Sequence, residues 1–161
     1  MSILFVMSTT GTYDPAPAEV VISEAKRAIA KQFRRGKALT SPKLAVEALM
    51  LDLADREHEV FGVIFLDNQH RIIDNTEMFR GTIDGASVYP REVVKAALAC
   101  NAAAVMFYHN HPSGGLAQPS EADRLITSKL KQALGMVDIR VLDHFILSGD
   151  DSYSFAESGL L

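Results

Sequence analysis

Residues 102–111 read Ala-Ala-Ala-Val-Met-Phe-Tyr-His-Asn-His, an apolar run that ends on two histidines. A continuous apolar run of this kind predicts a strand that is buried on both faces of a sheet. We expect the strand to run from Ala102 to Tyr108 and to deliver the chain directly to His109. The end of a buried strand is where a scaffold often presents reactive groups. The same stretch therefore predicts part of the core and the start of a site.

Flanking stretches predict the rest of the sheet and its helices. Apolar runs at residues 60–66 and 137–147 predict two more buried strands, and residues 71–80 predict the return strand of a hairpin with the first of them. Helices are expected at residues 90–100 and 120–134. Strands interleaved with helices indicate an α/β layered domain, and the hairpin makes its β-sheet mixed.

The N-terminal part of the chain has a different pattern. Apolar residues recur at helical spacing over residues 18–35 and predict a helix there. Ser41 followed by Pro42 is typical of an N-cap and a first helical residue, and predicts a second helix to about Asp55. Two prolines within residues 11–17 predict an extended linker before both helices. A short N-terminal helical segment is thus expected before the interleaved strands and helices.

Length and composition limit what the protein can be. The chain has 161 residues, of which 48% are hydrophobic and 22% charged, which is the balance of one globular domain with its own core. Its single cysteine, Cys100, excludes an internal disulfide and any site built on several cysteines. A lone cysteine suits a reducing compartment, and no stretch resembles a signal peptide or a membrane-spanning helix. We therefore expect a cytoplasmic protein with no membrane association; its oligomeric state does not follow from the sequence.

Net charge argues mildly against a dedicated nucleic-acid binder, because such domains usually carry a basic excess and this chain has a formal net charge of −4. Residues 26–37 are a local exception, which we call the basic stretch; its cations are Lys26, Arg27, Lys31, Arg34, Arg35 and Lys37. One interpretation is a solvated helix face with cations near the helix C-terminus, and the other is an arm that contacts phosphates or DNA. The negative net charge of the chain favours the solvated helix face, so DNA binding is possible but expected to be weak.

The segment after the apolar run carries candidate metal ligands. His109 and His111 are two residues apart on an extended backbone, so both imidazoles project to one side and can reach one ion. Asp123 follows three residues after Ser120, the expected N-cap of a helix, and faces back toward the preceding loop. A bare His-x-His is a weak signal, and Ser-x-x-Asp is a common helix start that needs no metal. Their conjunction directly after a buried strand favours one Zn²⁺ ion held by two imidazoles and a carboxylate, with an open position for water.

A zinc site that activates water also needs a base, which is usually a carboxylate. Glu57 and Glu59 both precede the first core strand and share a face of the extended chain. Glu59 lies nearer the buried run and is expected to be less solvated. The other interpretation is that both glutamates are exposed residues at the start of the strand, and the residue pattern alone does not decide between them.

Asp143 and His144 lie within the third predicted strand and also have two interpretations. One of them could orient a metal ligand through a hydrogen bond. More often such a pair serves only the structure. We expect the structural role.

Several segments of the chain together resemble one family. They include His-Asn-His-Pro-Ser-Gly at 109–114 and Pro-Ser-Glu-Ala-Asp at 119–123, and the others are residues 59–68, 79–84, 89–95, 143–146 and 154–157. Over residues 39–161 the chain is similar to the RadC family of JAMM/MPN-domain metalloproteins, historically described as DNA repair proteins. The resemblance implies a RadC-like JAMM/MPN domain at residues 39–161 and leaves residues 1–38 as an N-terminal extension with a helix.

The resemblance also implies a fold and a set of roles. The fold would be the layered JAMM/MPN domain, related to cytidine deaminases, with a mixed sheet and flanking helices. Zinc would be held by His109, His111 and Asp123, with Glu59 as the general base and Ser120 polarising the attacked carbonyl or stabilising its oxyanion. Eight residues separate His111 from Ser120, one more than is usual in JAMM motifs. Longer family members resemble a fusion to an N-terminal helix-hairpin-helix DNA-binding region, and we expect this chain to be a short form without it.

The leading functional prediction is a zinc-dependent metallohydrolase that acts on an amide or isopeptide bond, with a peptide or protein substrate. The alternative is a DNA-repair or mobile-element-associated protein that acts through DNA or a partner, with a metal site that does not support proteolysis. A two-metal nuclease usually needs more carboxylates than this segment supplies, so phosphodiester chemistry is the weaker explanation of the metal ligands.

Overall fold

The computed structural model of the chain describes residues 3–31, 33–39, 41–81 and 87–161. Its centre is a five-stranded sheet with the order β4-β3-β5-β6-β7. The strands are β3 (Val60–Leu66), β4 (Ile72–Arg80), β5 (Ala104–Asn110), β6 (Arg140–Ser148) and β7 (Asp151–Ser154). Antiparallel pairs join β3 to β4, β3 to β5 and β6 to β7, whereas β5 and β6 are parallel. The sheet is therefore mixed, and the antiparallel pair of β3 and β4 is the predicted hairpin.

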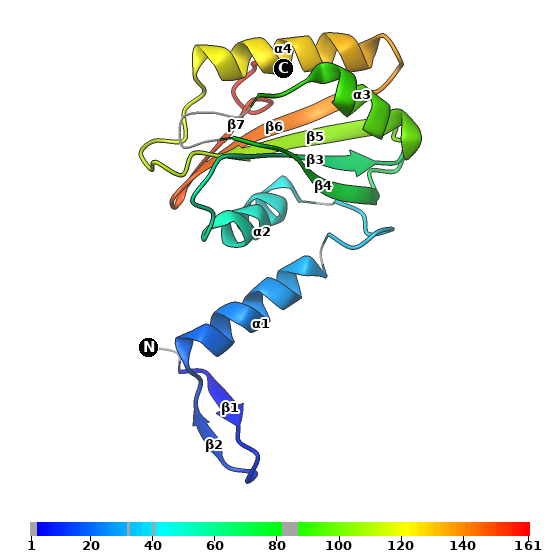
Figure 1. Cartoon of the computed structure of the whole chain (residues 1–161). Helices are drawn as coiled ribbons and strands as arrows, with labels where there is room; N and C mark the ends of the chain where they lie inside the picture. The colour runs from blue at the N-terminus through cyan, green and yellow to red at the C-terminus, as the bar shows by residue number, and fades with distance from the viewer. Residues whose placement is uncertain (1–2, 32, 40, 82–86) are drawn as a thin grey trace.

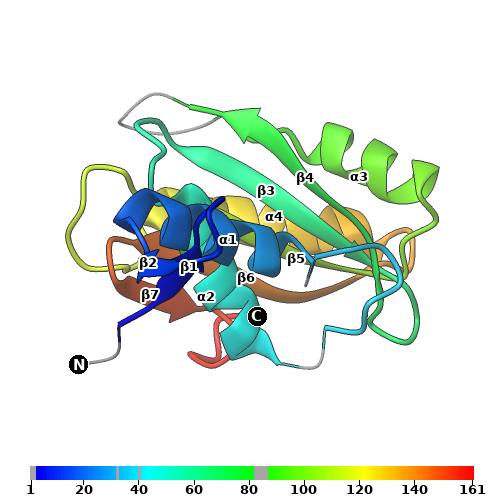
Figure 2. The ribbon, with the colours of Figure 1, turned by 90° about the horizontal axis from the view of Figure 1, so that it is seen from below.

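Helices cover both faces of this sheet, which confirms the expected α/β layered domain. Figure 1 shows α3 (Pro90–Ala99) and α4 (Glu121–Gly135) on one face, which we call the α4 face. On the opposite side lies α2 (Pro42–Leu53), on what we call the α2 face, and α1 (Ala18–Ala30) lies on that same side when the molecule is viewed from below in Figure 2. None of the helices in the described part of the chain is long and apolar enough to span a membrane.

The N-terminal segment projects away from the sheet (Figure 1) and differs in part from the prediction. Its first helix ends at Ala30 rather than near Arg35, because the N–H of Gly36 is hydrogen-bonded to the carbonyl of Ile72 at 2.7 Å and the chain turns there toward the sheet. The expected extended linker contains a strand, β2 (Tyr13–Pro15), which pairs with β1 (Phe5–Met7). Neither strand was predicted, because each is only three residues long.

The central strands differ less from the prediction. Strand β5 continues to Asn110, so His109 lies within the strand and not after it. Pairing on both sides extends it: His109 is paired with Phe61 of β3, and Asn110 with Leu147 of β6. Strand β7 was not predicted. Within the family-like segment 79–84, residues 82–84 lie outside the described part of the chain.

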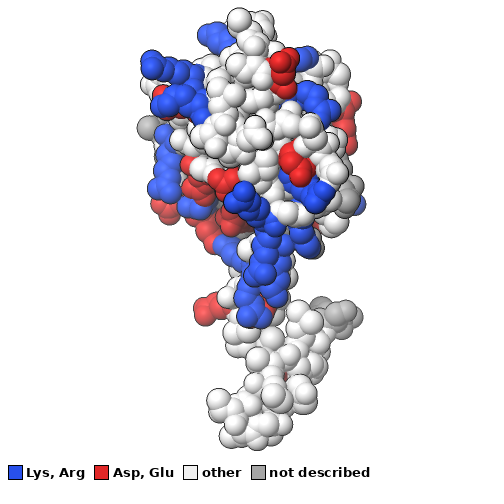
Figure 3. Space-filling model, turned by 90° about the vertical axis from the view of Figure 1, so that its right-hand side faces the viewer, with Lys and Arg blue, Asp and Glu red and all other residues white. Residues whose placement is uncertain are grey.

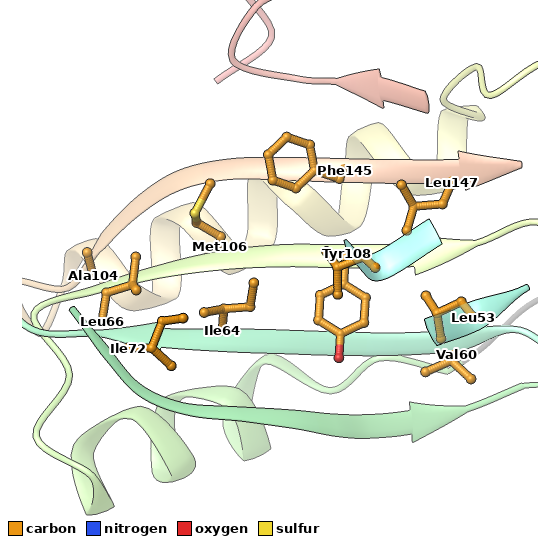
Figure 4. Packing of buried hydrophobic residues seen from close by; sticks show 11 residues of the cluster. Leu53, Val60, Ile64, Leu66, Ile72, Ala104, Met106, Tyr108, Phe145 and Leu147 are labelled. Carbon is orange, nitrogen blue, oxygen red and sulfur yellow. The ribbon is translucent and has the colours of Figure 1, made fainter. Parts of the chain in front are cut away.

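Alternation of side chains along the strands divides the core into two layers. Figure 4 shows the layer on the α2 face, where side chains of all three central strands meet. Its members include Ile64, Met106, Tyr108 and Phe145, together with Leu49 of α2. The layer on the α4 face includes Phe61, Val63, Phe65, Val105, Phe107 and the helix residues Val93, Leu130 and Leu134. Both helix N-caps expected from the sequence are present, Ser41 for α2 and Ser120 for α4.

A glycine in β3 makes the packing on the α2 face possible. The ring of Tyr108 lies across β3 directly over Gly62 (Figure 4), where it is 2% exposed and its hydroxyl donates to Asn75 at 3.0 Å. A methyl group on Gly62 would overlap this ring.

We therefore expect Gly62→Ala to lower the free energy of unfolding by about 1–3 kcal/mol, the usual effect of overpacking a core. Thermal unfolding monitored by circular dichroism measures the change. The matched control is Gly135→Ala at the exposed end of α4, where an added methyl meets nothing within 4 Å. It should be neutral or slightly stabilising. Equal melting temperatures for wild type and Gly62→Ala would contradict the described packing of Tyr108.

Candidate metal centre

The three predicted ligands meet at the end of β5. His109 lies in the strand, His111 follows two residues later, and Asp123 lies in the first turn of α4. The Nε2 atom of His109 is 3.0 Å from Nε2 of His111 and 3.2 Å from Oδ1 of Asp123. Nε2 of His111 is 3.8 Å from Oδ2 of Asp123. One donor atom from each residue therefore lies within 4.8 Å of the other two, and the three could hold one metal ion.

The chemistry and spacing of these donors fit zinc. Zinc takes imidazole nitrogens at about 2.0–2.1 Å in tetrahedral geometry, which sets two donors of one ion roughly 3.3 Å apart. The two imidazole nitrogens are 3.0 Å apart, and each lies near a different oxygen of Asp123, at 3.2 Å for Oδ1 and 3.8 Å for Oδ2, so all three contacts are close to that value. Two imidazole nitrogens at 3.0 Å are also unfavourable unless a proton or a cation lies between them. Three protein ligands leave one position for water, as in catalytic and not in structural zinc sites.

Electrostatic interactions keep these ligands in their metal-binding forms. Burial alone would raise the pKa of Asp123, but the neighbouring imidazole of His109 and the hydrogen bonds from Ser120 lower that pKa well below its usual value. Burial, and then the charge of His109, lower the pKa of His111, and Asp123 only partly opposes them. An ionised carboxylate and a neutral imidazole are the forms that coordinate metal. Both shifts therefore favour metal binding near neutral pH.

Ser120 holds Asp123 through a reciprocal cap. Its hydroxyl donates to Oδ2 of Asp123 at 2.6 Å and accepts from the Asp123 N–H at 3.2 Å, while its own N–H donates to Oδ2 at 2.8 Å. This capping box leaves Oδ1 facing His109. The predicted role of Ser120 toward a substrate carbonyl would require its hydroxyl to rotate away from Asp123, and that role stays a prediction.

Glu59 lies two residues before the strand residue that is paired with His109. Phe61 of β3 is paired with His109 of β5. The pairing of β3 with β5 stops at that pair, and Glu59 and His111 are the residues two positions beyond it on the two segments. Glu59 is half-buried, whereas Glu57 is exposed at a bend in the chain. The structure therefore supports the expectation that Glu59 is the less solvated of the two glutamates, and it leaves the role of either one untested.

Asn110 fixes the backbone on both sides of Glu59. Its buried side chain accepts from the N–H of Val60 at 2.7 Å and donates to the carbonyl of His58 at 3.2 Å. Sequence reasoning missed this residue. The sequence did contain a signal for it, which is its position between the two histidines. Because side chains alternate along a strand, the Asn110 side chain points to the opposite face from His109 and His111.

His144 contacts a predicted ligand. Its Nε2 lies 2.8 Å from Nδ1 of His109, and its Nδ1 lies 2.7 Å from the hydroxyl of Thr127. Burial, followed by the charge of His109, lowers the pKa of His144 well below its usual value. This contact is the one that the other interpretation, orientation of a ligand through a hydrogen bond, requires, and the role of His144 stays untested. The carboxylate of Asp143 accepts from the Ser154 hydroxyl and from backbone N–H groups, which is consistent with the structural role expected for it.

The chain matches one known protein family and several bacterial relatives over most of its length. Residues 39–160 match the family model described as "RadC-like JAB domain". The chain is 55% identical over 141 residues to a "UPF0758 protein" of Vibrio cholerae serotype O1 (strain ATCC 39315 / El Tor Inaba N16961), a match that covers 88% of each protein. It is 54% identical over 141 residues to a "UPF0758 protein" of Vibrio campbellii, and 51% identical over 146 residues to one of Aeromonas hydrophila. These matches cover 88% and 91% of this chain, but only 62% and 65% of the two longer relatives.

Metal content tests the ligand set directly. We expect about one zinc ion per purified chain, and far less than one in His111→Ala, because two remaining ligands bind zinc more weakly than three. Elemental analysis of proteins dialysed against one buffer measures both values. The matched control is His70→Asn: His70 lies in an exposed turn at φ 55°, a conformation that asparagine adopts readily, and this variant should keep its zinc. A full complement of zinc in His111→Ala would show that the ligand assignment is wrong.

Proposed function

The chain belongs to the RadC-like JAB domain family, and on this premise we propose that it is a zinc-dependent metallohydrolase. The proposed reaction is hydrolysis of an amide bond in a peptide or isopeptide linkage, with a peptide or protein as substrate. The observation that carries the proposal is the cluster of His109, His111 and Asp123. It lies at the strand end where Phe61, two residues after the half-buried Glu59, is paired with His109. Metal ligands alone would suit a structural ion, whereas a carboxylate beside them supplies acid–base chemistry.

Each residue has one task in the proposed reaction. His109, His111 and Asp123 hold a zinc ion, which when bound supplies a Lewis acid for the substrate carbonyl and lowers the pKa of water. Glu59 takes a proton from the attacking water, whose oxygen forms a bond to the carbonyl carbon. As the C–N bond breaks, Glu59 returns that proton to the leaving amine. Ser120 donates to the developing oxyanion once its hydroxyl has rotated from Asp123.

The surroundings of Glu59 support its role as the base. Proton transfer needs the carboxylate held within hydrogen-bond reach of the water, and a fixed backbone limits where that carboxylate can lie. The two hydrogen bonds of Asn110, to Val60 and His58, hold the backbone on either side of Glu59. Glu57 is exposed at a bend in the chain, a position more consistent with a solvated surface residue.

The two glutamates provide a matched pair of variants. We expect Glu59→Gln to keep its zinc and its fold but to lose most hydrolysis, by about 10²–10⁴-fold, because the amide cannot accept the proton. Glu57→Gln should stay near the wild-type rate. A peptide-library screen with wild type supplies the substrate, and metal content and turnover are then measured together. Loss of zinc in Glu59→Gln would make it a ligand, and loss of turnover only in Glu57→Gln would move the base by two residues.

The alternative function depends on the basic stretch. Figure 3 shows Lys and Arg side chains gathered where the N-terminal segment meets the sheet, above a hairpin with few charges. Two of these cations have carboxylate partners: Lys26 is paired with Asp55, and Arg27 with Glu24 at 2.8 Å. Such pairing reduces the positive charge available to phosphates.

We therefore expect measurable binding to plain duplex DNA only at low salt. Phosphate contacts dominate non-specific affinity, and six cations with an overall charge of −4 give a weak and steeply salt-dependent interaction. Fluorescence anisotropy with a labelled duplex at several salt concentrations measures it. Replacing Arg34 and Arg35 by Gln should abolish the low-salt binding. Submicromolar affinity at physiological salt would instead favour the DNA-associated function.

A further inference from the structure

We infer that His144 is a positioning residue of the metal centre, which fixes the tautomer of His109 so that the Nε2 lone pair of this ligand is free for metal. The inference rests on the candidate metal cluster of the proposed function. It does not depend on whether the site cleaves peptides. It is carried by a continuous row of hydrogen bonds that joins α4, β6 and β5.

The direction of each hydrogen bond follows from the first one. Thr127 has a single hydroxyl proton, which it donates to the carbonyl of Asp123 at 2.6 Å. Its oxygen can then only accept from the N–H at Nδ1 of His144, 2.7 Å away. A neutral His144 protonated at Nδ1 has a lone pair at Nε2, which accepts from the N–H at Nδ1 of His109 at 2.8 Å. In a neutral His109 the remaining nitrogen, Nε2, therefore carries no proton, and it faces the other two ligands.

The ring of His144 has little freedom to leave this arrangement. It is fully buried, with 0% of its surface exposed, and three aromatic rings enclose it. Phe155 is stacked on it with ring centres 4.9 Å apart, and Phe61 and Phe107 approach edge-on at 5.4 and 5.8 Å. Asp143 helps to hold Phe155, because it accepts from the N–H of the next residue, Ala156, at 3.0 Å. The ring therefore presents its two nitrogens in one orientation.

An irregularity in β6 brings His144 to this position. Val105 of β5 is paired with Val141, but the next residue, Met106, is paired with Asp143, so Leu142 is an extra residue in β6. Such a bulge exchanges the faces to which later side chains point. Without it, His144 would lie on the α2 face, away from His109. Bulges next to functional sites commonly re-aim a side chain in this way.

Zinc affinity, measured by competition with a chromophoric chelator, tests the inference. His144→Leu removes both ring nitrogens, and Thr127→Val removes the hydroxyl at nearly constant size. We expect each to weaken zinc binding by about 10–100-fold, the usual effect of losing the hydrogen-bond partner of a ligand histidine. Thr127→Ser keeps the hydroxyl and should bind zinc within about threefold of wild type. His144→Gln can place an amide oxygen near the position of Nε2, and should recover most of the loss.

A second measurement reports the tautomer itself. In the zinc-free wild type, ¹⁵N NMR of the imidazole rings should show His109 protonated at Nδ1 and unprotonated at Nε2. A merely structural His144 would not set this pattern. Thermal unfolding of each zinc-free variant shows whether it is folded. If His144→Leu is unfolded, the zinc affinities of Thr127→Val and Thr127→Ser test the inference in its place.

Two results would overturn the inference: a proton on Nε2 of His109 in the zinc-free wild type, or folded Thr127→Val and His144→Leu proteins that bind zinc as tightly as wild type. The proposed hydrolysis stands or fails separately. If zinc affinities and tautomer are as expected but the wild type cleaves nothing in the peptide screen, only the proposed function is contradicted.

Discussion

The pairing of β5 between β3 and β6 is the constraint on which the rest of this structure depends. A strand with neighbours on both edges cannot shift or rotate, so its alternating side chains are assigned to fixed faces. Met106 and Tyr108 enter the core on the α2 face, and Phe107 enters it on the α4 face. His109 continues the second series. The candidate metal centre is thus an extension of the core packing and does not depend on a loop to bring its first ligand into place.

Helix α4 contributes to the same site through the face by which it packs. Thr127, Leu130 and Leu134 are its buried residues, at the three- and four-residue spacing of one helix face, and Asp123 lies one turn before them. Burying each leucine contributes on the order of 1.5–3 kcal/mol, so the helix is held against the sheet by apolar contacts rather than by the metal. The Ser120 cap then fixes the first turn, where the carboxylate of Asp123 lies. The ligand is therefore positioned by helix packing and capping together.

Polar groups buried within this apolar layer connect the site to the stability of the fold. His109, His144 and Thr127 are all buried, and each has a hydrogen-bond partner in the row described above. Leaving a buried donor or acceptor without its partner costs about 1–3 kcal/mol. A substitution at one of these residues consequently changes both the free energy of unfolding and the affinity for metal. Variants of matched size and hydrogen-bonding capacity are needed to separate the two effects.

The sequence by itself determined the central strands, the helix starts and the candidate ligands, because these depend on local patterns. Apolar runs placed β3 and β5, serine caps placed the starts of α2 and α4, and the histidine spacing with Asp123 indicated the metal cluster. Only the tertiary structure decided the end of α1, the hydrogen bonds of Asn110 to β3 and the contact of His144 with His109. Gly36 bonds to Ile72, Asn110 bonds across to β3, and Leu142 shifts the register of β6 against β5. Each of these features depends on hydrogen bonds between residues far apart in the chain, and local periodicity and propensity carry no information about which distant backbone groups will pair.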